Sequence, residues 1–212
     1  MGVSGFLVAW TAHADTVAFN SFGPGNTYDG GSVYYVGKAG SSPTEQAAQF
    51  ISQASGFLST VELALTYPSN HPPEPVNVFL YNDLNGSPDN SSQIFLGAVD
   101  PVAVFNPSNN HAVATLTVTS QVFVSLDSMY WLVLKPADPN GLTFWNFSTD
   151  TLGQMRVSGD DSTWEPESES RIAAFRVNVV PEPGSMTLLS VGLAISLLFF
   201  RDRARRTRNA RN

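Results

Sequence analysis

The side chains best suited to bind a ligand are carboxylates and amides in two turn-rich loops. One loop contains Asp83, Asn85 and Asp89, and the other contains Asp160 and Asp161. Calcium takes several oxygen ligands from flexible segments, which such loops can supply. Neither loop has the ligand spacing of an EF-hand, and acidic residues are also common in simple solvated turns. Calcium is therefore the one cofactor worth testing, and the sequence indicates no other.

Aromatic residues offer a second kind of chemistry, because flat rings stack on the apolar faces of sugars. The candidates for carbohydrate contact are Trp145, Trp164, Tyr34 and Tyr35. The alternative is that these rings belong to the core, as we expect for Trp131 in the most apolar segment of the chain. A carbohydrate-binding module is therefore one hypothesis for this protein.

Catalytic groups are scarce. Beyond the N-terminal segment only His71 and His111 remain, both in Asn- and Pro-rich turns, and the chain has no cysteine. It also has no nucleophile elbow, no phosphate-binding glycine loop and no His-x-x-x-His spacing. We expect no enzyme. A hydrolase using two carboxylates is the third hypothesis, and it would require a shared cleft.

The C-terminal segment, residues 180–212, has three parts. Val180 to Ser185 contains Pro181, Glu182 and Pro183, and prolines break helices. The next 15 residues, Met186 to Phe200, carry no charge. An isolated apolar run enters a bilayer as a helix, so we expect a transmembrane helix over residues 184–200. The basic end, 201–212, would stay cytoplasmic; the arginines that fix this topology are Arg201, Arg203, Arg205, Arg206 and Arg208.

This order of motif, apolar segment and basic end resembles the PEP-CTERM sorting signal of Gram-negative bacteria. The resemblance covers Val180 to about Arg208 and implies processing by an exosortase, a membrane enzyme of organisms that make extracellular polysaccharide. The expected partners are thus that enzyme, the membrane and extracellular polysaccharide. An ordinary membrane anchor after a chance proline pair is the alternative.

An outward-facing body requires an export signal, and residues 1–14 resemble the end of one. Val3 to Trp10 is apolar, and Ala12 and Ala14 form a cleavage pattern that leaves Asp15 as the mature start. A basic residue before the apolar part is missing, so we expect the true start codon to lie upstream in the gene. The alternative is a first β-strand.

The remaining body, residues 15–179, is predicted to be all-β. Counting Asp15 to Val180, five basic residues against 16 acidic ones give a charge of -11, which argues against nucleic acid as a partner. Short alternating segments, such as Leu58 to Tyr67, are separated by turns rich in Gly, Pro, Asn and Asp. This pattern predicts an antiparallel, jelly-roll-like β-sandwich. Gln46 to Ile51 fits a short helix or a strand.

Short motifs between Gly23 and Val177, including Val76 to Gly86, resemble exported choice-of-anchor domains, type R, which have no assigned activity. Together the sequence predicts a surface protein of the envelope. It would be anchored in the inner membrane with its body in the periplasm, then reach the cell surface or medium after processing. Its expected role is structural or adhesive, within a polysaccharide-rich layer or biofilm matrix.

Overall fold

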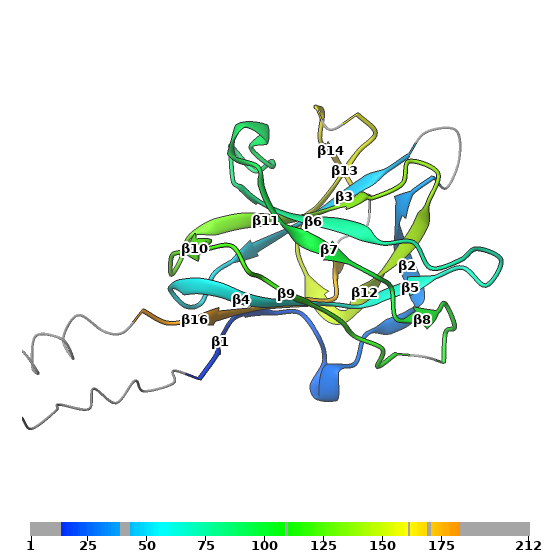
Figure 1. Ribbon diagram of the computed structural model, residues 1–212, viewed down its shortest axis with the longest axis horizontal. Coiled ribbons are helices and arrows are strands. Elements are labelled where there is room, and N and C mark those ends of the chain that lie inside the picture. Colours follow the sequence, from blue (N-terminus) through cyan, green and yellow to red (C-terminus); the bar gives the residue numbers. More distant parts are fainter. Residues whose placement is uncertain (1–13, 39–42, 109, 161, 169–170, 183–212) are drawn as a thin grey trace, which may run out of the picture. The chain divides into compact units, whose positions relative to one another are not determined.

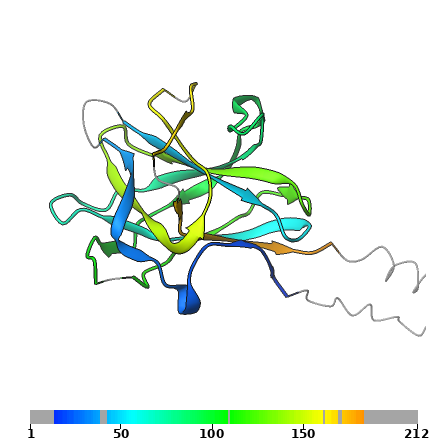
Figure 2. The same ribbon diagram turned by 180° about the vertical axis from the view of Figure 1, so that it is seen from behind.

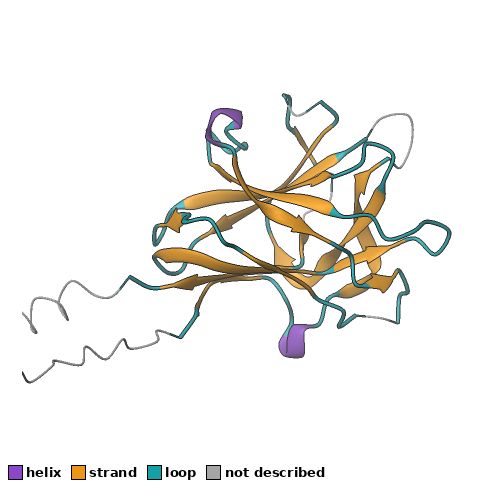
Figure 3. Cartoon of the chain, in the orientation of Figure 1, coloured by secondary structure: helices purple, strands orange, loops and turns teal. Residues whose placement is uncertain are grey.

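The computed structural model describes residues 14–38, 43–108, 110–160, 162–168 and 171–182. The chain divides into two units, one of which is the body, Asp15–Val180. The other, Met1–Ala14 with Pro181–Asn212, lies almost wholly outside the described residues. The body is all-β, as predicted, and its described part contains only two short 3₁₀ turns, η1 (Pro24–Asn26) and η2 (Asn90–Ser92), besides strands (Figure 3).

Three sheets build the body. The first, which we call the tail-bearing sheet, has the order β1 (Thr16–Asn20), β16 (Phe175–Val180), β4 (Gly56–Leu63) and β10 (Phe123–Val124), and β9 (Ala114–Thr117) also pairs with β4. The six-stranded sheet has the order β14 (Glu165–Pro166), β13 (Met155–Ser158), β3 (Glu45–Ile51), β11 (Met129–Pro136), β6 (Val76–Asn82) and β7 (Ile94–Val99). The third, the side sheet, has the order β15 (Arg171–Ala173), β12 (Leu142–Leu152), β5 (Leu65–Tyr67) and β8 (Ala103–Val104), and β2 (Asp29–Gly37) pairs with β12.

Neighbouring strands are antiparallel throughout these sheets, except for the parallel pair β5 and β8. Antiparallel pairing was predicted and is confirmed. The segment 46–51, which fitted either a helix or a strand, lies in β3 because β11 and β13 pair with it on both sides. A run of this length gains more from two ladders than from one isolated helical turn.

One core joins the three sheets. Alternate residues of β4, β11 and β12 point into it, including Leu63, Leu132 and Trp145, all fully buried. Figures 1 and 2 show the six-stranded sheet on one side of this core and the tail-bearing sheet, with β4 and β16, on the other. Burial of apolar side chains at about 25 cal/mol per Å² is the main source of stability in a chain without disulfides.

The tail-bearing sheet turns into the side sheet at a corner made of two alanines. Ala64 separates β4 from β5, and Ala174 separates β15 from β16. The Ala64 amide donates to the Ala174 carbonyl (3.1 Å), the Ala174 amide to Asn146 (2.8 Å), and the Asn146 amide to Ala64 (2.9 Å). The single strand expected over Leu58 to Tyr67 is therefore wrong, since the chain changes sheets at Ala64. Both alanines are fully buried, so larger side chains would not fit this corner.

An ion pair links two strands of the side sheet, β2 and β15. The Arg171 guanidinium lies 2.6 Å from the Asp29 carboxylate and stacks on the Phe147 ring, 4.8 Å from its centroid. Burial raises the pKa of Asp29, but the Gly31 amide and Arg171 outweigh it, so the pKa lies below its ordinary value. The pair therefore links β2 to β15 as a charged contact at neutral pH.

Candidate functional site

The last strand of the body, β16, leads directly into the proline motif. Its neighbours are β1 and β4, and Val180 is paired with Phe57 while Val179 is paired with Thr16. The strand ends at Val180 because Pro181 follows it, and proline has no amide hydrogen to continue the ladder. Thr16 stands at the beginning of the body and Val179 near its end, so the chain enters and leaves the body at adjacent positions.

Close backbone contact holds the end of β16 against the start of β4. A Cβ atom at Gly56 would lie 2.5 Å from the Val180 carbonyl oxygen. Only glycine permits that approach, because real Cβ atoms are not found so close to a backbone oxygen. Gly56 therefore fixes the position from which the tail departs.

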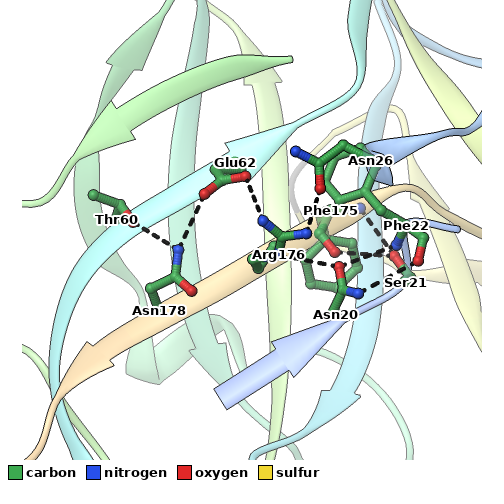
Figure 4. A network of polar contacts seen from close by, with 9 residues as sticks. All are labelled: Asn20, Ser21, Phe22, Asn26, Thr60, Glu62, Phe175, Arg176 and Asn178. Atoms are coloured by element: carbon green, nitrogen blue, oxygen red, sulfur yellow. Dashed lines mark hydrogen bonds and ion pairs between the residues drawn. The ribbon is translucent and has the colours of Figure 1, made fainter. Parts of the chain in front are cut away.

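A polar network on the outer face of the tail-bearing sheet joins β16 to both neighbours (Figure 4). The Arg176 guanidinium lies 3.1 Å from the Glu62 carboxylate of β4, and it donates to the side chains of Asn20 (3.3 Å) and Asn26. Asn178 donates to Glu62 (3.2 Å) and to Thr60 (2.9 Å). Charge-assisted bonds of this kind are stronger than neutral ones, so the network ties the tail-bearing strand into the sheet.

A buried serine strengthens the same strand from the β1 side. The Ser21 hydroxyl shares its one hydrogen between the carbonyls of Ala173 (2.9 Å) and Phe175 (3.1 Å), and its oxygen accepts from the Phe175 amide (2.9 Å). Ser21 is 1% exposed, so these bonds have no competition from water. We call the end of β16 with these contacts the junction; it is hydrogen-bonded to both neighbouring strands.

Comparison with protein-family models identifies the segment that begins at the end of β16. The model of the PEP-CTERM protein-sorting motif matches residues 179–206. The chain carries a PEP-CTERM sorting motif. Such a motif marks an exported protein that is anchored at the membrane and handled by an exosortase-type enzyme. Among curated proteins, none matches the chain in sequence.

The PEP-CTERM motif begins in the last residues of β16 and continues beyond the body. Of the predicted motif residues, Val180 is 37% exposed, Pro181 is half-buried and Glu182 is exposed, while Pro183 lies outside the described residues. The apolar segment 184–200 also lies outside them, as do the arginines of the PEP-CTERM basic end, Arg201, Arg203, Arg205, Arg206 and Arg208. Within the described ranges, no helix is long and apolar enough to cross a membrane. The predicted leader, 1–14, is described only at Ala14.

Two of the predicted carbohydrate contacts are wrong. Trp145 is fully buried, and its indole nitrogen donates to the Ala174 carbonyl (3.1 Å) at the alanine corner. Tyr34 is 4% exposed, and its hydroxyl donates to the Arg171 carbonyl (2.6 Å). Both side chains point to the core because they occupy inward positions of β12 and β2, and no sugar reaches them in the folded protein.

The other two aromatics lie nearer the surface, on different sheets. Trp164 is 9% exposed and covers the outer face of the six-stranded sheet, where its ring meets Tyr81 edge-on and its nitrogen donates to Asn90 (2.8 Å). Tyr35, in β2 of the side sheet, is 47% exposed and stands edge-on against Phe144. The structure thus does not bring the four predicted aromatics into one platform.

The acidic loops use their carboxylates to hold the fold. Asp83 accepts from the Trp131 indole (2.7 Å), the Gln49 amide (3.1 Å) and the Gly86 backbone (3.1 Å). Asp89 caps the η2 turn through Ser91. Asn85 is exposed in the same loop, with a positive φ of 55°.

Asp160 has the same kind of local role in the second loop. Its carboxylate accepts from Ser162, Thr163 and Ser158, and these bonds lower its pKa to about 2. Asp161 lies outside the described residues. Within the part of the chain that the structure describes, no three acidic or histidine side chains gather as a metal site would require. The calcium site stays a prediction without support from this geometry.

Sequence reasoning missed the residues that matter most at the junction. The contact of Arg176 and Asn178 with Glu62 depends on a pairing of β4 with β16 that the local pattern does not give. The available signal was the two polar residues, Arg176 and Asn178, that alternate with apolar ones in the strand before the PEP-CTERM motif. His71 and His111 are both exposed in loops, away from any such network in the described residues.

Proposed function

We propose that this protein is a structural or adhesive component of a polysaccharide-rich envelope or biofilm matrix, delivered by an exosortase-type system. The observation that carries the proposal is the PEP-CTERM motif at residues 179–206, which begins in the last strand of the body. In this proposal the body is a jelly-roll-like β-sandwich of the choice-of-anchor kind. Residues 184–200 are its transmembrane helix and the arginines its cytoplasmic end.

The hydrogen bonding of the junction supports a structural role. A matrix protein transmits load between its anchor and its surroundings, and here the anchor continues from a strand hydrogen-bonded on both sides. Antiparallel ladders loaded along the strand must break several bonds together. The proposal assigns no catalysis to the body, whose two loop histidines are both exposed.

The deciding experiment is to determine the C-terminus of the mature protein by mass spectrometry, in a host with an exosortase and in the same strain without it. We expect surface protein ending near Pro183 in the first strain and membrane-held protein retaining its arginines in the second. A variant with Pro181→Ala and Pro183→Ala should remain unprocessed in both. An intact chain that is soluble in the cytosol, with Ala14 still joined to Asp15, would refute the proposal.

Carbohydrate binding remains the second candidate, and Tyr35 is the observation in its favour. Its ring is 47% exposed beside Phe144, so one face is open to stack on a sugar. A glycan array with the wild-type chain and Tyr35→Ala separates the two candidates. Binding that is lost in Tyr35→Ala would favour a carbohydrate-binding module, whereas no binding would leave the matrix role alone.

A further inference from the structure

Exposed apolar side chains surround the end of the body at which β16 leaves the tail-bearing sheet. Phe123, Phe57 and Val180 lie beside one another across β10, β4 and β16, at paired positions of the ladder. They are 41%, 37% and 37% exposed, and the two phenylalanine rings meet edge-on with centroids 5.3 Å apart. Val17 of β1, 45% exposed, lies opposite Asn178 in the next strand.

Two turns at the same end carry three more such residues. Ile51 closes β3 and is paired with Met129, which opens β11, and Leu126 lies in the turn between β10 and β11. Their exposed fractions are 50%, 38% and 52%. Hydrogen bonds join the two turns, from Leu126 to Ser55 and from Asp127 to Ser52, both 2.8 Å. Figures 1 and 2 show the start of β4, β10 and the end of β16 at one end of the body.

We call these seven residues the tail-proximal rim. They are half of the 14 large hydrophobic residues that are exposed in the described part of the chain. Singly exposed apolar residues are normal on a protein surface. These seven share one end of the body, on outward positions of the tail-bearing sheet and the six-stranded sheet and in the turn before β11. The rim is therefore a candidate contact surface.

The position of the rim in the chain indicates what it contacts. Only Pro181 to Ser185 separate Val180 from the charge-free segment Met186 to Phe200. At about 3.3 Å per residue, five residues span at most about 17 Å, so a body whose tail enters the bilayer keeps this end close to the lipid surface. Phenylalanine, leucine and isoleucine favour the boundary between headgroups and acyl chains.

The charge around the rim indicates the chemistry of the surface that it contacts. Acidic residues flank the rim in the chain: Asp15 precedes Val17 by two residues, Asp127 follows Leu126, and Glu182 follows Val180 by two residues. The turns 52–55 and 125–128 contain no lysine or arginine. Such a surface is not attracted to anionic lipid or to an acidic partner. Its contact must depend on apolar burial, which a zwitterionic bilayer provides as well as an anionic one.

We propose that the tail-proximal rim rests on the lipid bilayer while the protein is anchored, so that the body is held against the membrane surface before processing. This inference relies on the proposed membrane anchoring of the tail. Release of the tail then exposes the rim to water, which would make the freed body more adhesive than the anchored one.

The chain has no cysteine, so one introduced cysteine is a unique labelling site. Leu126→Cys places a fluorophore on the rim. Val102→Cys is a matched control, since Val102 is 54% exposed and follows β7, whose last residue Val99 pairs with Val76 at the other end of the six-stranded sheet. The full chain is reconstituted in phosphatidylcholine vesicles with brominated acyl chains. We expect quenching at position 126 to be about threefold stronger than at position 102, and unchanged by added anionic lipid.

Equal and weak quenching at the two positions, in protein that resists carbonate extraction, would overturn the inference and leave the anchoring intact. Protein that carbonate releases would instead refute the proposed anchoring. Shielding of position 126 from aqueous iodide in native membranes, without quenching by brominated lipid, would show that a protein covers the rim and would also overturn the lipid proposal. In a second variant, Phe57→Ser with Phe123→Ser should weaken the quenching at 126, whereas Val102→Ser with Val104→Ser should not.

Discussion

The junction between body and tail makes a quantitative prediction about Arg176. Its guanidinium pairs with Glu62 at 3.1 Å, contacts Asn20 and Asn26, and lies over the Phe22 ring. The side chains of the ion pair are 21% and 20% exposed, so water screens the pair only in part. Losing hydrogen bonds to a charged group of this kind costs about 1.5–3 kcal/mol. We take about 2 kcal/mol for Arg176→Met, which keeps the apolar stem of the side chain.

For a body of this size that loss lowers the melting temperature by about 4–8 °C. Glu62→Gln keeps the acceptor for Asn178 and should cost less, about 1 kcal/mol. In the double variant the effects should not add, with a coupling energy of about 0.5–1.5 kcal/mol. Urea denaturation of the four proteins in detergent measures all three quantities.

Lys38→Met is the matched control for this cycle, because Lys38 is exposed and lies outside the junction. Its change in the free energy of unfolding should stay within about 0.5 kcal/mol. A coupling energy near zero between positions 176 and 62 would mean that the contact contributes nothing to holding β16. In that event our inference that this network stabilises β16 in its sheet would be wrong.

Other expectations follow from the same contacts. Trp131→Phe removes one of three donors to the Asp83 carboxylate and should lower the free energy of unfolding by about 2–3 kcal/mol, measured in urea. Because the pKa of Asp29 is lowered from 3.8, its pair with Arg171 stabilises the fold above that pH and loses this contribution as pH falls below it. Asp29→Asn should therefore show a smaller drop in melting temperature on acidification than wild type, and an equal drop would contradict the shift. Added calcium should leave the melting temperature unchanged, and a clear rise would restore the acidic loops as a metal site.

Alternation of apolar and polar residues was sufficient to predict the all-β class and the antiparallel sheets. It failed at Ala64, where a run that alternates without interruption crosses from one sheet to another. The bend there depends on hydrogen bonds with Asn146 and Ala174, far away in the chain. Local pattern contains no information on such partners, so the corner could not be predicted.

Only part of the candidate site could likewise be predicted from the sequence. The PEP-CTERM motif is a linear signal, so sequence alone identified it and the family match confirmed the prediction. Surface chemistry is a property of the folded chain. Trp145 and Trp164 are the same residue type in similar turn-bounded segments, yet one is fully buried and the other covers an outer sheet face. The resemblance to choice-of-anchor domains stays a prediction.

The place of β16 between β1 and β4 also has a consequence for biogenesis. The strand is the last body segment to be synthesised, yet it occupies the inside of its sheet. Until Val180 has crossed the export channel, β1 and β4 have no common neighbour and the sheet stays divided. We therefore expect the body to complete its fold only after β16 has been exported, when the sorting motif that begins in this strand has reached the membrane.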